Sequence, residues 1–335
     1  MKPLVHAALV NDRFGDPGLL LDFLFQRRAM LFDLGDIAAL APRKVLRVSH
    51  VFVSHAHMDH FSGFDQLLRI VLGRGARLSL YGPPGFIGQV AHKLAAYSWN
   101  LVENFTEDLT LEAAELGEDG TLSRAAFHCR AGFPREDLPD GAWRGGVLVE
   151  EPAFRVRAAM LDHGIPCLAF ALEEQRHVNI FKARLSEMGL GVGPWLQKLK
   201  SAVLAGVPDA TPIRASWREG AASRERNLPL GELKDRALRV VPGQKIAYVT
   251  DIRFHDENLN KIAALADGAD ILFIETPFLE SDSDIAARKN HLTAAQAGLI
   301  ARRAGAKSIV PFHFSPRYTG REGLLIAEAE SAFRG

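Results

Sequence analysis

Residues 55–60 contain the densest group of chemically reactive side chains in the chain: His55, His57, Asp59 and His60. Three imidazoles and one carboxylate within six positions are donors that suit a transition-metal ion such as zinc. The apolar run over 51–53 predicts a buried strand before them, and helically spaced apolar residues over 64–72 predict a helix after them. The cluster is therefore predicted to lie in a strand-to-helix loop, where a rigid scaffold can direct the side chains to one point.

Three further residues of metal-binding type follow apolar runs elsewhere in the chain. Asp251 and His313 come directly after such runs, and His163 follows another with one residue between. Taken singly, each is interpreted as an ordinary capping or turn residue. Because each repeats the context of residues 55–60, we predict that these side chains converge on one metal site.

The composition is that of a globular protein and excludes several classes. The 335 residues are 47% hydrophobic, carry no net charge and have a pI near 7.2, so no global field favours a nucleic acid or a membrane. Only Cys129 and Cys167 are present, which excludes a disulfide framework. The start of the chain lacks the pattern of a signal peptide and no long apolar run occurs, so we expect a cytoplasmic location and no membrane partner.

Apolar runs typical of strands alternate with amphipathic stretches along the chain. The most complete local pattern predicts a helix that begins with a capping box of Thr293 and Gln296 and ends at Gly305. The acidic stretch 103–119 is predicted to be a solvated edge. Mixed strands and helices of this kind predict an α/β or α+β layered fold rather than a helical bundle or a pure β-sandwich.

Longer motifs give the chain a resemblance to a known family. They surround the histidine cluster and recur at intervals downstream: 54–63, 81–85, 248–251, 269–275, 291–293 and 313–318. Over about residues 30–335 the chain resembles the metallo-β-lactamase superfamily and, within it, the ribonuclease Z branch. The His-Phe-Ser-Pro-Arg-Tyr ending and the upstream His-Leu-Thr are the most branch-specific of these motifs.

The resemblance implies an α+β fold of the αββα type. In that fold two mixed β-sheets pack face to face, helices flank them, and the metal ions lie at one edge. Residues 1–335 are then predicted to form one metallo-β-lactamase-type hydrolase domain that carries an inserted arm over 176–239.

The resemblance also implies how the ligands divide between two ions. One zinc is assigned to His55, His57 and His163, the other to Asp59, His60 and His313, and Asp251 bridges the pair. Two Zn²⁺ per chain are expected, with Mn²⁺ as a substitute that the same donors accept. Two ions about 3.5–4 Å apart lower the pKa of a shared water and stabilise both oxygens of an in-line phosphoryl displacement.

Three residues receive catalytic roles from the same resemblance. Asp59 would orient or deprotonate the nucleophile, and His291, held by Glu275, would protonate the leaving oxygen. The alternative for His291 and Glu275 is a structural pair that covers a helix N-terminus.

The segment 176–239 carries twelve Lys and Arg against six Asp and Glu, in a chain that is neutral overall. Its Gly-Pro element, Lys198 and Lys200 resemble the protruding arm by which ribonuclease Z proteins hold tRNA, where phosphate contacts supply sequence-independent affinity. The alternative is a surface insertion with solvated charges. Near the last metal ligand, Ser315 and Arg317 are predicted phosphate contacts, because a guanidinium matches phosphate oxygens.

The chain departs from the family pattern at three places. Residues 9–18 are acidic where the family has a glycine-rich strand and a basic loop. Ile274 stands where the family has a His before the catalytic Glu, and Asp251 is flanked by Thr250 and Ile252 instead of Gly and Thr. None of these departures removes a metal ligand, so we expect the metal centre to be present. They leave two substrates to be distinguished, the 3′ end of a tRNA and another phosphodiester.

Together these features predict a dinuclear zinc phosphodiesterase, a ribonuclease Z-like endoribonuclease that acts on the 3′ ends of tRNA precursors. The alternative on the same scaffold is a hydrolase of small phosphodiesters or other small esters. A metal-free RNA-binding or scaffolding protein is disfavoured, because all seven ligand positions are present. The resemblance also suggests a homodimer.

Overall fold

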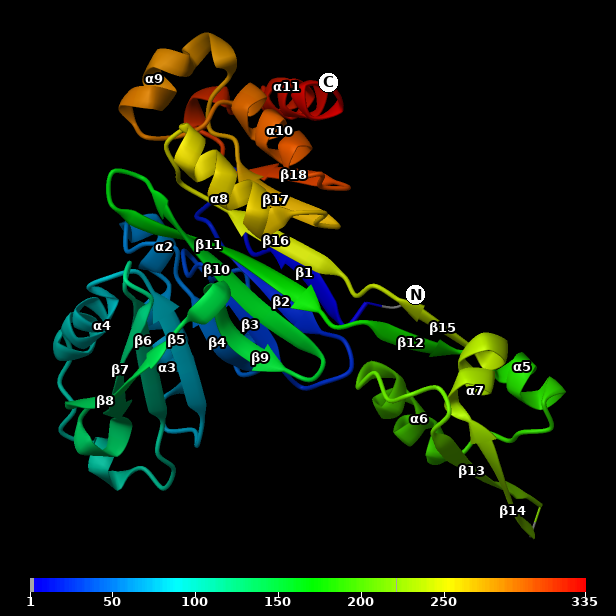
Figure 1. The fold of residues 1–335 in the computed structure, drawn as a ribbon. Helices are drawn as coiled ribbons and strands as arrows, with labels where there is room; N and C mark the ends of the chain where they lie inside the picture. Colours follow the sequence, from blue (N-terminus) through cyan, green and yellow to red (C-terminus); the bar gives the residue numbers. More distant parts are fainter. Residues whose placement is uncertain (1–2, 221) are drawn as a thin grey trace. The chain divides into compact units, whose positions relative to one another are not determined.

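The structure, a computed structural model, describes residues 3–220 and 222–335 and contains two large mixed β-sheets (Figure 1). In these residues the first sheet has eight strands in sequential order: β1 (Val5–Leu9), β2 (Leu19–Phe23), β3 (Ala29–Phe32), β4 (Val48–Phe52), β5 (Arg77–Gly82), β6 (Thr110–Leu116), β7 (Thr121–His128) and β8 (Arg135–Ala142). Strands β3 to β6 run parallel, whereas the outer strands pair antiparallel. The carboxyl ends of the parallel strands therefore meet at one edge of the sheet.

The second sheet has six strands among the described residues, in the order β18 (Ile309–Phe312), β17 (Ile271–Glu275), β16 (Lys245–Val249), β11 (Pro166–Glu174), β10 (Phe154–Asp162) and β9 (Val147–Glu151). Strands β16, β17 and β18 are parallel, so their carboxyl ends also share an edge. Strand β11 pairs antiparallel with β16, which makes this sheet mixed as well.

The two sheets enclose an aromatic core. The rings of Phe32 and Phe170, one from each sheet, lie 5.2 Å apart, and Tyr248 stacks on Phe312 at 5.1 Å. All four side chains are buried. Strands buried on both faces are hydrophobic throughout, which explains the continuous apolar runs in the sequence.

Helices cover the outer faces of the two sheets (Figure 1). On the first sheet they are α1 (Pro42–Val45), α2 (Met58–Phe61), α3 (Phe64–Val71) and α4 (Phe86–Ala95). On the second they are α8 (Asp256–Ala266), α10 (Ala294–Arg303) and α11 (Glu322–Arg334), whereas α9 (Ser283–Arg288) packs in a separate small cluster beside α11. This αββα arrangement confirms the predicted fold class. Across 3–220 and 222–335, the helices are too short or too polar to cross a membrane.

Short 3₁₀ helices lie in the connections: η1 (Val102–Asn104), η2 (Cys129–Ala131), η3 (Arg144–Gly146), η4 (Glu280–Asp282) and η5 (Pro316–Tyr318). The prediction of a solvated edge over 103–119 is wrong for its second half, because β6 lies inside the first sheet. Leu111 and Leu116 are buried on opposite faces of that strand, and Glu112 and Glu115, also on opposite faces, remain half-buried. The charges therefore interrupt both faces of a strand that packs in the sheet interior.

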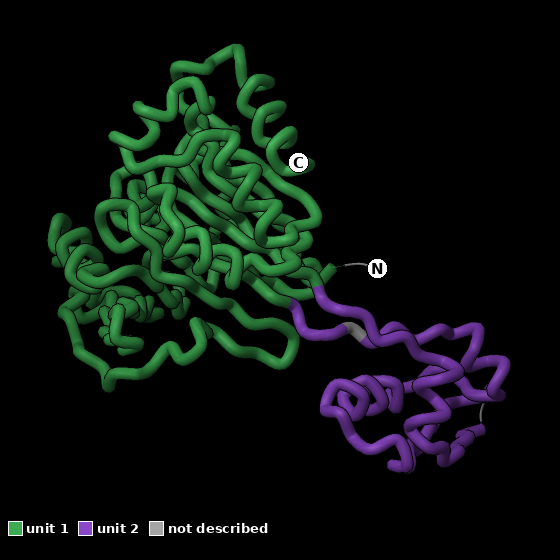
Figure 2. Tube along the Cα trace, turned by 45° about the horizontal axis from the view of Figure 1, so that its top comes forward, with its two compact units in different colours: residues 1–173, 244–335 green, residues 174–243 purple. Residues whose placement is uncertain are grey.

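The chain divides into two compact units, residues 1–173 with 244–335, and residues 174–243 (Figure 2). The second unit contains β12 (His177–Ile180), α5 (Lys182–Glu187), α6 (Trp195–Leu204), β13 (Pro212–Glu219), β14 (Ala222–Pro229), α7 (Leu230–Ala237) and β15 (Leu238–Val241). Strand β12 pairs with β15, and β13 with β14. Trp195, Leu199 and Leu233 are buried in a core of its own.

Candidate metal centre

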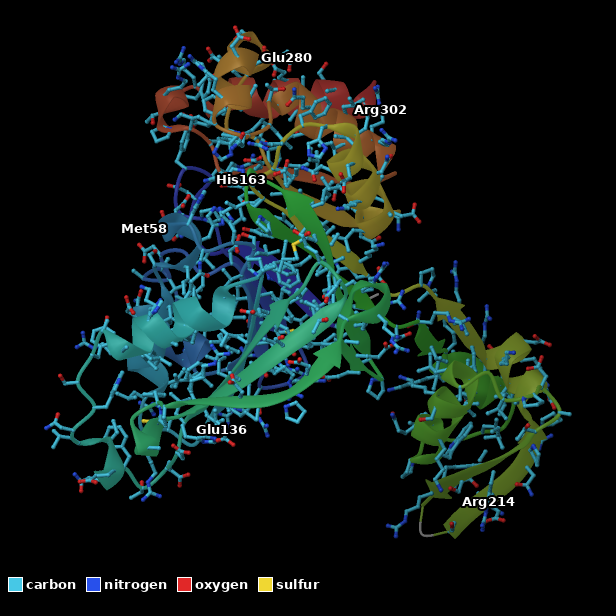
Figure 3. The ribbon with its side chains drawn as sticks, turned by 60° about the vertical axis from the view of Figure 1, so that its left-hand side comes forward. Met58, Glu136, His163, Arg214, Glu280 and Arg302 are labelled. Carbon is cyan, nitrogen blue, oxygen red and sulfur yellow. The ribbon has the colours of Figure 1, made fainter. Side chains whose placement is uncertain are left out.

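The histidine cluster occupies the turn between β4 and α2. His55 follows the end of β4 by three residues, and His57 is the N-cap of α2, a single turn closed by a hydrogen bond from His60 N to His57 O of 3.1 Å. This turn places His60 in the interior and leaves Met58 84% exposed on the outside (Figure 3). The short helix therefore separates the ligand-type side chains from the residues that face solvent.

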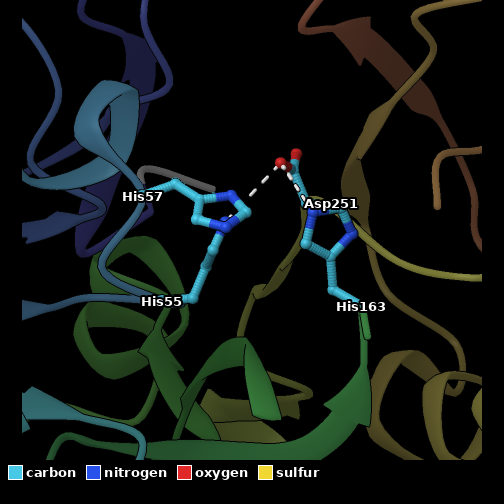
Figure 4. A group of neighbouring side chains, drawn as sticks. All are labelled: His55, His57, His163 and Asp251. Atoms are coloured by element: carbon cyan, nitrogen blue, oxygen red, sulfur yellow. Dashed lines mark ion pairs between the residues drawn. The ribbon is translucent and has the colours of Figure 1, made fainter. Parts of the chain in front are cut away.

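The distant predicted residues meet this cluster at the carboxyl ends of the other sheet's strands. Asp251 follows β16, His313 follows β18 and His163 follows β10. Asp251 Oδ2 lies 3.7 Å from His55 Nε2 and 3.6 Å from His163 Nε2 (Figure 4). The same oxygen is 3.3 Å from His60 Nε2, and Asp251 Oδ1 is 2.8 Å from His313 Nδ1.

The donor atoms form groups of the size of a metal coordination sphere. Among the described residues, donors within 4.8 Å of one another comprise His55, His57, His163 and Asp251; Asp59, His60 and His313; and Asp251, Glu275, His291 and His313. The structure thus brings together the seven side chains that the sequence predicted to converge. Glu275 and His291 lie beside them.

The residues fit a metal ion because buried donors point inward without a hydrogen-bond partner. Nε2 of His55 and Nε2 of His60 are buried and make no hydrogen bond to any described residue, although both face Asp251 Oδ2, at 3.7 Å and 3.3 Å. An unpaired buried polar atom costs about 1–3 kcal/mol, and a cation would relieve that cost at each nitrogen. Imidazole and carboxylate donors together suit zinc or a similar divalent ion.

Without a metal ion, the histidines of the site differ in protonation, and the protonated ones balance the charge of the buried carboxylates. Burial and the charge of His60 lower the pKa of His55 to about 2. Burial would also lower the pKa of His60, but the Asp251 and Asp33 carboxylates raise it to about 10. A buried carboxylate requires such a positive partner, which a bound cation can replace.

Asp33 is a residue of the site that the sequence reasoning missed. It follows β3, is fully buried, and its Oδ2 lies 2.9 Å from His60 Nδ1. Its carboxylate also accepts hydrogen bonds from the Ser54 hydroxyl at 2.9 Å and the Tyr248 hydroxyl at 2.9 Å. These contacts fix the His60 ring so that Nε2 points to Asp251. Its place directly after an apolar run is the same pattern that identified the predicted ligands.

Glu275 holds His291 at the rim of the site. Glu275 Oε2 accepts a hydrogen bond of 2.7 Å from His291 Nδ1, and Oε1 accepts backbone N–H groups of Ile252 at 2.9 Å and Leu292 at 3.2 Å. Burial would lower the pKa of His291, but the Glu275 carboxylate raises it. His291 Nε2 is left free to face solvent or a bound molecule, because the imidazole is 17% exposed.

Backbone strain concentrates around these side chains. In residues 3–220 and 222–335, four residues other than Gly have a left-handed φ, and Asp33, Asn290 and His313 are three of them, at φ of 60°, 61° and 58°. Such a conformation costs about 1–3 kcal/mol in most residues and persists where the surroundings impose it. These backbone conformations therefore lower the stability of the fold while they orient the side chains of the site.

A cavity of about 250 Å³ opens beside the cluster. Its lining contains Phe14, Gly15, Asp16, Pro17, Asp59, Pro277, Phe278, Lys289, His291, His313, Phe314, Ser315 and Pro316. Ser315 thus lies where a substrate contact was predicted, whereas Arg317 is outside this lining and pairs with Asp282 at 3.1 Å. Lys289, which the sequence reasoning missed, has an exposed ammonium 5.9 Å from the centre of the Phe278 ring.

The two predicted RNA contacts in the basic segment both lie on α6 of the second unit. Lys198 is exposed and Lys200 is half-buried. The hairpin of β13 and β14 in the same unit exposes further arginines, of which Arg214 pairs with Glu225 across the strands (Figure 3).

A four-layered αββα fold with histidine and aspartate donors at its strand ends defines a metallo-β-lactamase-type hydrolase. The metallo-beta-lactamase superfamily model matches residues 5–114, and a beta-lactamase superfamily domain matches residues 205–314. The fold is similar to the metallo-beta-lactamase fold protein YhfI of Bacillus subtilis, with a TM-score of 0.55, 15% identity, and coverage of 98% of this chain and 93% of that chain. It is also similar to human tRNase Z, short form, with a TM-score of 0.53, 18% identity and coverage of 94% and 92%.

Sequence comparison narrows this class to one family. Ribonuclease Z of Deinococcus radiodurans is 33% identical over 306 residues, which are 90% of this chain and 87% of that protein. The chain therefore belongs to the ribonuclease Z family of the metallo-β-lactamase superfamily. It is a metal-dependent hydrolase of the nuclease type, as predicted from the motifs.

Proposed function

We propose that this protein is a dinuclear zinc phosphodiesterase that cleaves RNA at the 3′ ends of tRNA precursors. The observation that carries the proposal is the convergence of separate strand ends on Asp251. Membership of the ribonuclease Z family supports RNA as the substrate class.

The proposed ligand sets follow the groups of neighbouring donors. One ion would be held by His55, His57 and His163, the other by Asp59, His60 and His313, and Asp251 would be a ligand common to the two sets. When bound, the pair supplies an activated water nucleophile and Lewis-acid stabilisation of the charge that develops on the phosphate.

Asp59 orients the attacking water in this proposal. Its side chain is 41% exposed and lines the cavity, and Oδ2 lies 3.3 Å from His313 Nε2. Burial would raise the pKa of Asp59, but the hydrogen bond from His313 and the charge of His60 lower it to about 2. The carboxylate is therefore ionised at neutral pH and can accept a hydrogen bond from water.

His291 donates the proton to the leaving oxygen. Glu275 holds its Nδ1 proton, so Nε2 is the atom available for transfer. The raised pKa keeps a larger fraction of the imidazole protonated at neutral pH, which a general acid requires. Because His291 lines the same cavity as Asp59, the proton donor and the residue that orients the attacking water can act on one bound phosphate.

RNA binding is proposed for two surfaces. Ser315 and Lys289 lie at the cavity, where a hydroxyl and an ammonium can contact phosphate oxygens. Lys198 and Lys200 lie in the basic second unit, which supplies affinity that does not depend on sequence.

A cleavage assay with two substrates tests the function. The purified, zinc-loaded protein is compared on a tRNA precursor with a 3′ extension and on bis(p-nitrophenyl) phosphate. We expect a single cut at the 3′ side of the precursor and slower turnover of the small diester. Turnover of the small diester alone, with every RNA intact, would instead identify a small-phosphodiester hydrolase.

A further inference from the structure

A hydrogen-bonded network of non-ligand residues joins three loops of the candidate metal centre. The loops carry His163, Asp251 and His291, and the connecting side chains are Arg253 and Asn290. We propose that Arg253 and Asn290 are positioning residues that hold the metal ligand His163 in register with Asp251 and with the proton donor. The inference rests on the proposed function of the site and adds two residues to it.

Asn290 fixes both the ring and the backbone of His163. His163 Nδ1 donates a hydrogen bond of 2.8 Å to the carbonyl oxygen of Asn290, and Asn290 Nδ2 donates one of 3.1 Å to the carbonyl oxygen of His163. Because a carbonyl can only accept, the proton of the neutral imidazole stays on Nδ1. Nε2, which lies 3.6 Å from Asp251 Oδ2, is thereby kept in the form that binds a metal.

Arg253 holds the Asn290 amide in place. Its Nε donates a hydrogen bond of 2.8 Å to Asn290 Oδ1, and Nη1 lies 3.3 Å from Asp162 Oδ2. The Arg253 backbone N–H donates a hydrogen bond of 2.9 Å to the carbonyl oxygen of Asp162. Arg253 therefore contacts both Asp162, the last residue of β10 before His163, and Asn290, which directly precedes His291.

The placement of these residues favours a role at the site over a role in the core. Arg253 is exposed and Asn290 is half-buried, so neither fills the hydrophobic interior. Asn290 also adopts φ of 61°, which costs less in Asn than in most residues and is characteristic of functional sites. Arg253 follows Asp251 by two residues and Asn290 directly precedes His291, so a shift in either moves a functional side chain.

The test removes the Asn290 side chain alone. Asn290→Gly keeps the backbone carbonyl that accepts from His163 and suits a positive φ, so the fold is expected to persist. We expect the full-length variant to bind one of its two Zn²⁺ about tenfold more weakly in competition with a chromogenic chelator. On bis(p-nitrophenyl) phosphate, kcat should fall about tenfold with KM unchanged, because orientation and not substrate binding is disturbed.

Two further variants make the test specific. Arg253→Gln should act in the same direction, and the double variant should be no worse than the poorer single variant, because Arg253 acts through the Asn290 amide. The control is Asn260→Ala on the exposed surface of α8. This variant removes another Asn–Arg contact, the hydrogen bond of 2.6 Å from Arg303 of α10 to Asn260 Oδ1, and should change neither metal affinity nor kcat.

Wild-type Zn²⁺ affinity in a folded Asn290→Gly variant would overturn the inference, as would effects that add in the double variant. A change in KM alone would do the same, because it would indicate a substrate contact. The metal titration needs no RNA. If the protein fails to cleave RNA, the Zn²⁺ affinities of the variants and the wild type can still be compared.

Discussion

Asp251 is the side chain around which the other donors gather. Its carboxylate is buried, Oδ2 faces the His55 and His163 imidazoles, and Oδ1 faces His313. Burial would raise its pKa, but the charges of His313 and His60 hold it well below the ordinary value. An ionised carboxylate at such a position requires compensating positive charge, which is why we propose that cations lie on both sides of it.

The role of His291 predicts an effect that depends on the leaving group. His291→Ala should keep both metals bound, because its carboxylate partner Glu275 remains held by backbone amides. Cleavage should slow by about 10²–10⁴-fold for a poor leaving group such as a ribose oxygen, and much less for p-nitrophenolate, which leaves without a proton. Rates measured over a series of substituted aryl diesters check this. The same slowing across the series would argue against proton donation.

Lys289 predicts a salt-dependent contribution to RNA binding. No ion pair joins its exposed ammonium to a described residue at the cavity, so it can neutralise a phosphate beside the scissile bond. Lys289→Gln should weaken RNA binding and reduce the slope of log affinity against log salt by about one. Arg288→Gln, a neighbouring exposed cation outside the cavity lining, is the control. If the slope of log affinity against log salt is the same in the Lys289 variant and the wild type, Lys289 does not contact an RNA phosphate.

His50 predicts a pH dependence of stability. Burial and the adjacent Arg28 lower its pKa to about 4 from the ordinary 6.5, and Arg28 Nη2 lies 3.3 Å from its Nδ1. The unfolded chain takes up a proton below pH 6.5 while the folded state resists it, so this contribution to stability is complete above pH 6.5 and is lost as pH falls toward 4.

Between about pH 8 and about pH 5, the wild type should lose about 2 kcal/mol more free energy of unfolding than His50→Gln. Urea unfolding of both proteins at the two pH values measures the difference. Parallel losses in the two proteins would show that His50 stays protonated or exposed in the folded state.

At the scale of elements, the sequence predicted the helix ends and strand ends that are determined by residues close together in the chain. The capping box of Thr293 and Gln296 begins α10, and Gly305 adopts a left-handed φ of 61° just after it. The ends of β10, β16 and β18 were predicted because their apolar runs stop at a polar residue. The acidic strand β6 was missed, since its charges interrupt both faces and only its pairing with the neighbouring strands reveals it.

The second unit predicts a separation of chemistry from RNA affinity. Residues 174–243 have their own core, and Glu173 pairs with Lys245 across β11 and β16, so a two-residue Asn-Gly turn can replace residues 174–244 and join these paired residues. This deletion should leave turnover of bis(p-nitrophenyl) phosphate within about twofold of the wild type. RNA affinity should fall at least about tenfold, because the phosphate contacts are lost.

The matched control for the deletion keeps the second unit folded. The double variant Lys198→Gln and Lys200→Gln should weaken RNA binding in the same direction without altering small-diester turnover. Wild-type RNA affinity in the deletion variant would discard the second unit as a binding surface.

At the scale of the whole molecule, the site exists because two mixed sheets present the carboxyl ends of their strands to each other. His55 and His60 come from the first sheet, and His163, Asp251 and His313 from the second. The sequence predicted which residues would meet, because each lies in the same strand-end context. The same context marks Asp33, which the sequence reasoning overlooked, but the hydrogen bonds of Asp33 to His60 and the network through Asn290 could not be predicted, since they depend on contacts between loops that are distant in the chain.

The central claim is that these strand ends hold a pair of metal ions. The most direct measurement is the metal content of the purified chain, reconstituted with Zn²⁺, freed of excess ion and analysed by inductively coupled plasma mass spectrometry beside Asp251→Ala. We predict two zinc ions per wild-type chain and at most one in the variant. A wild-type chain with fewer than two ions, or a variant that keeps both, would contradict the account.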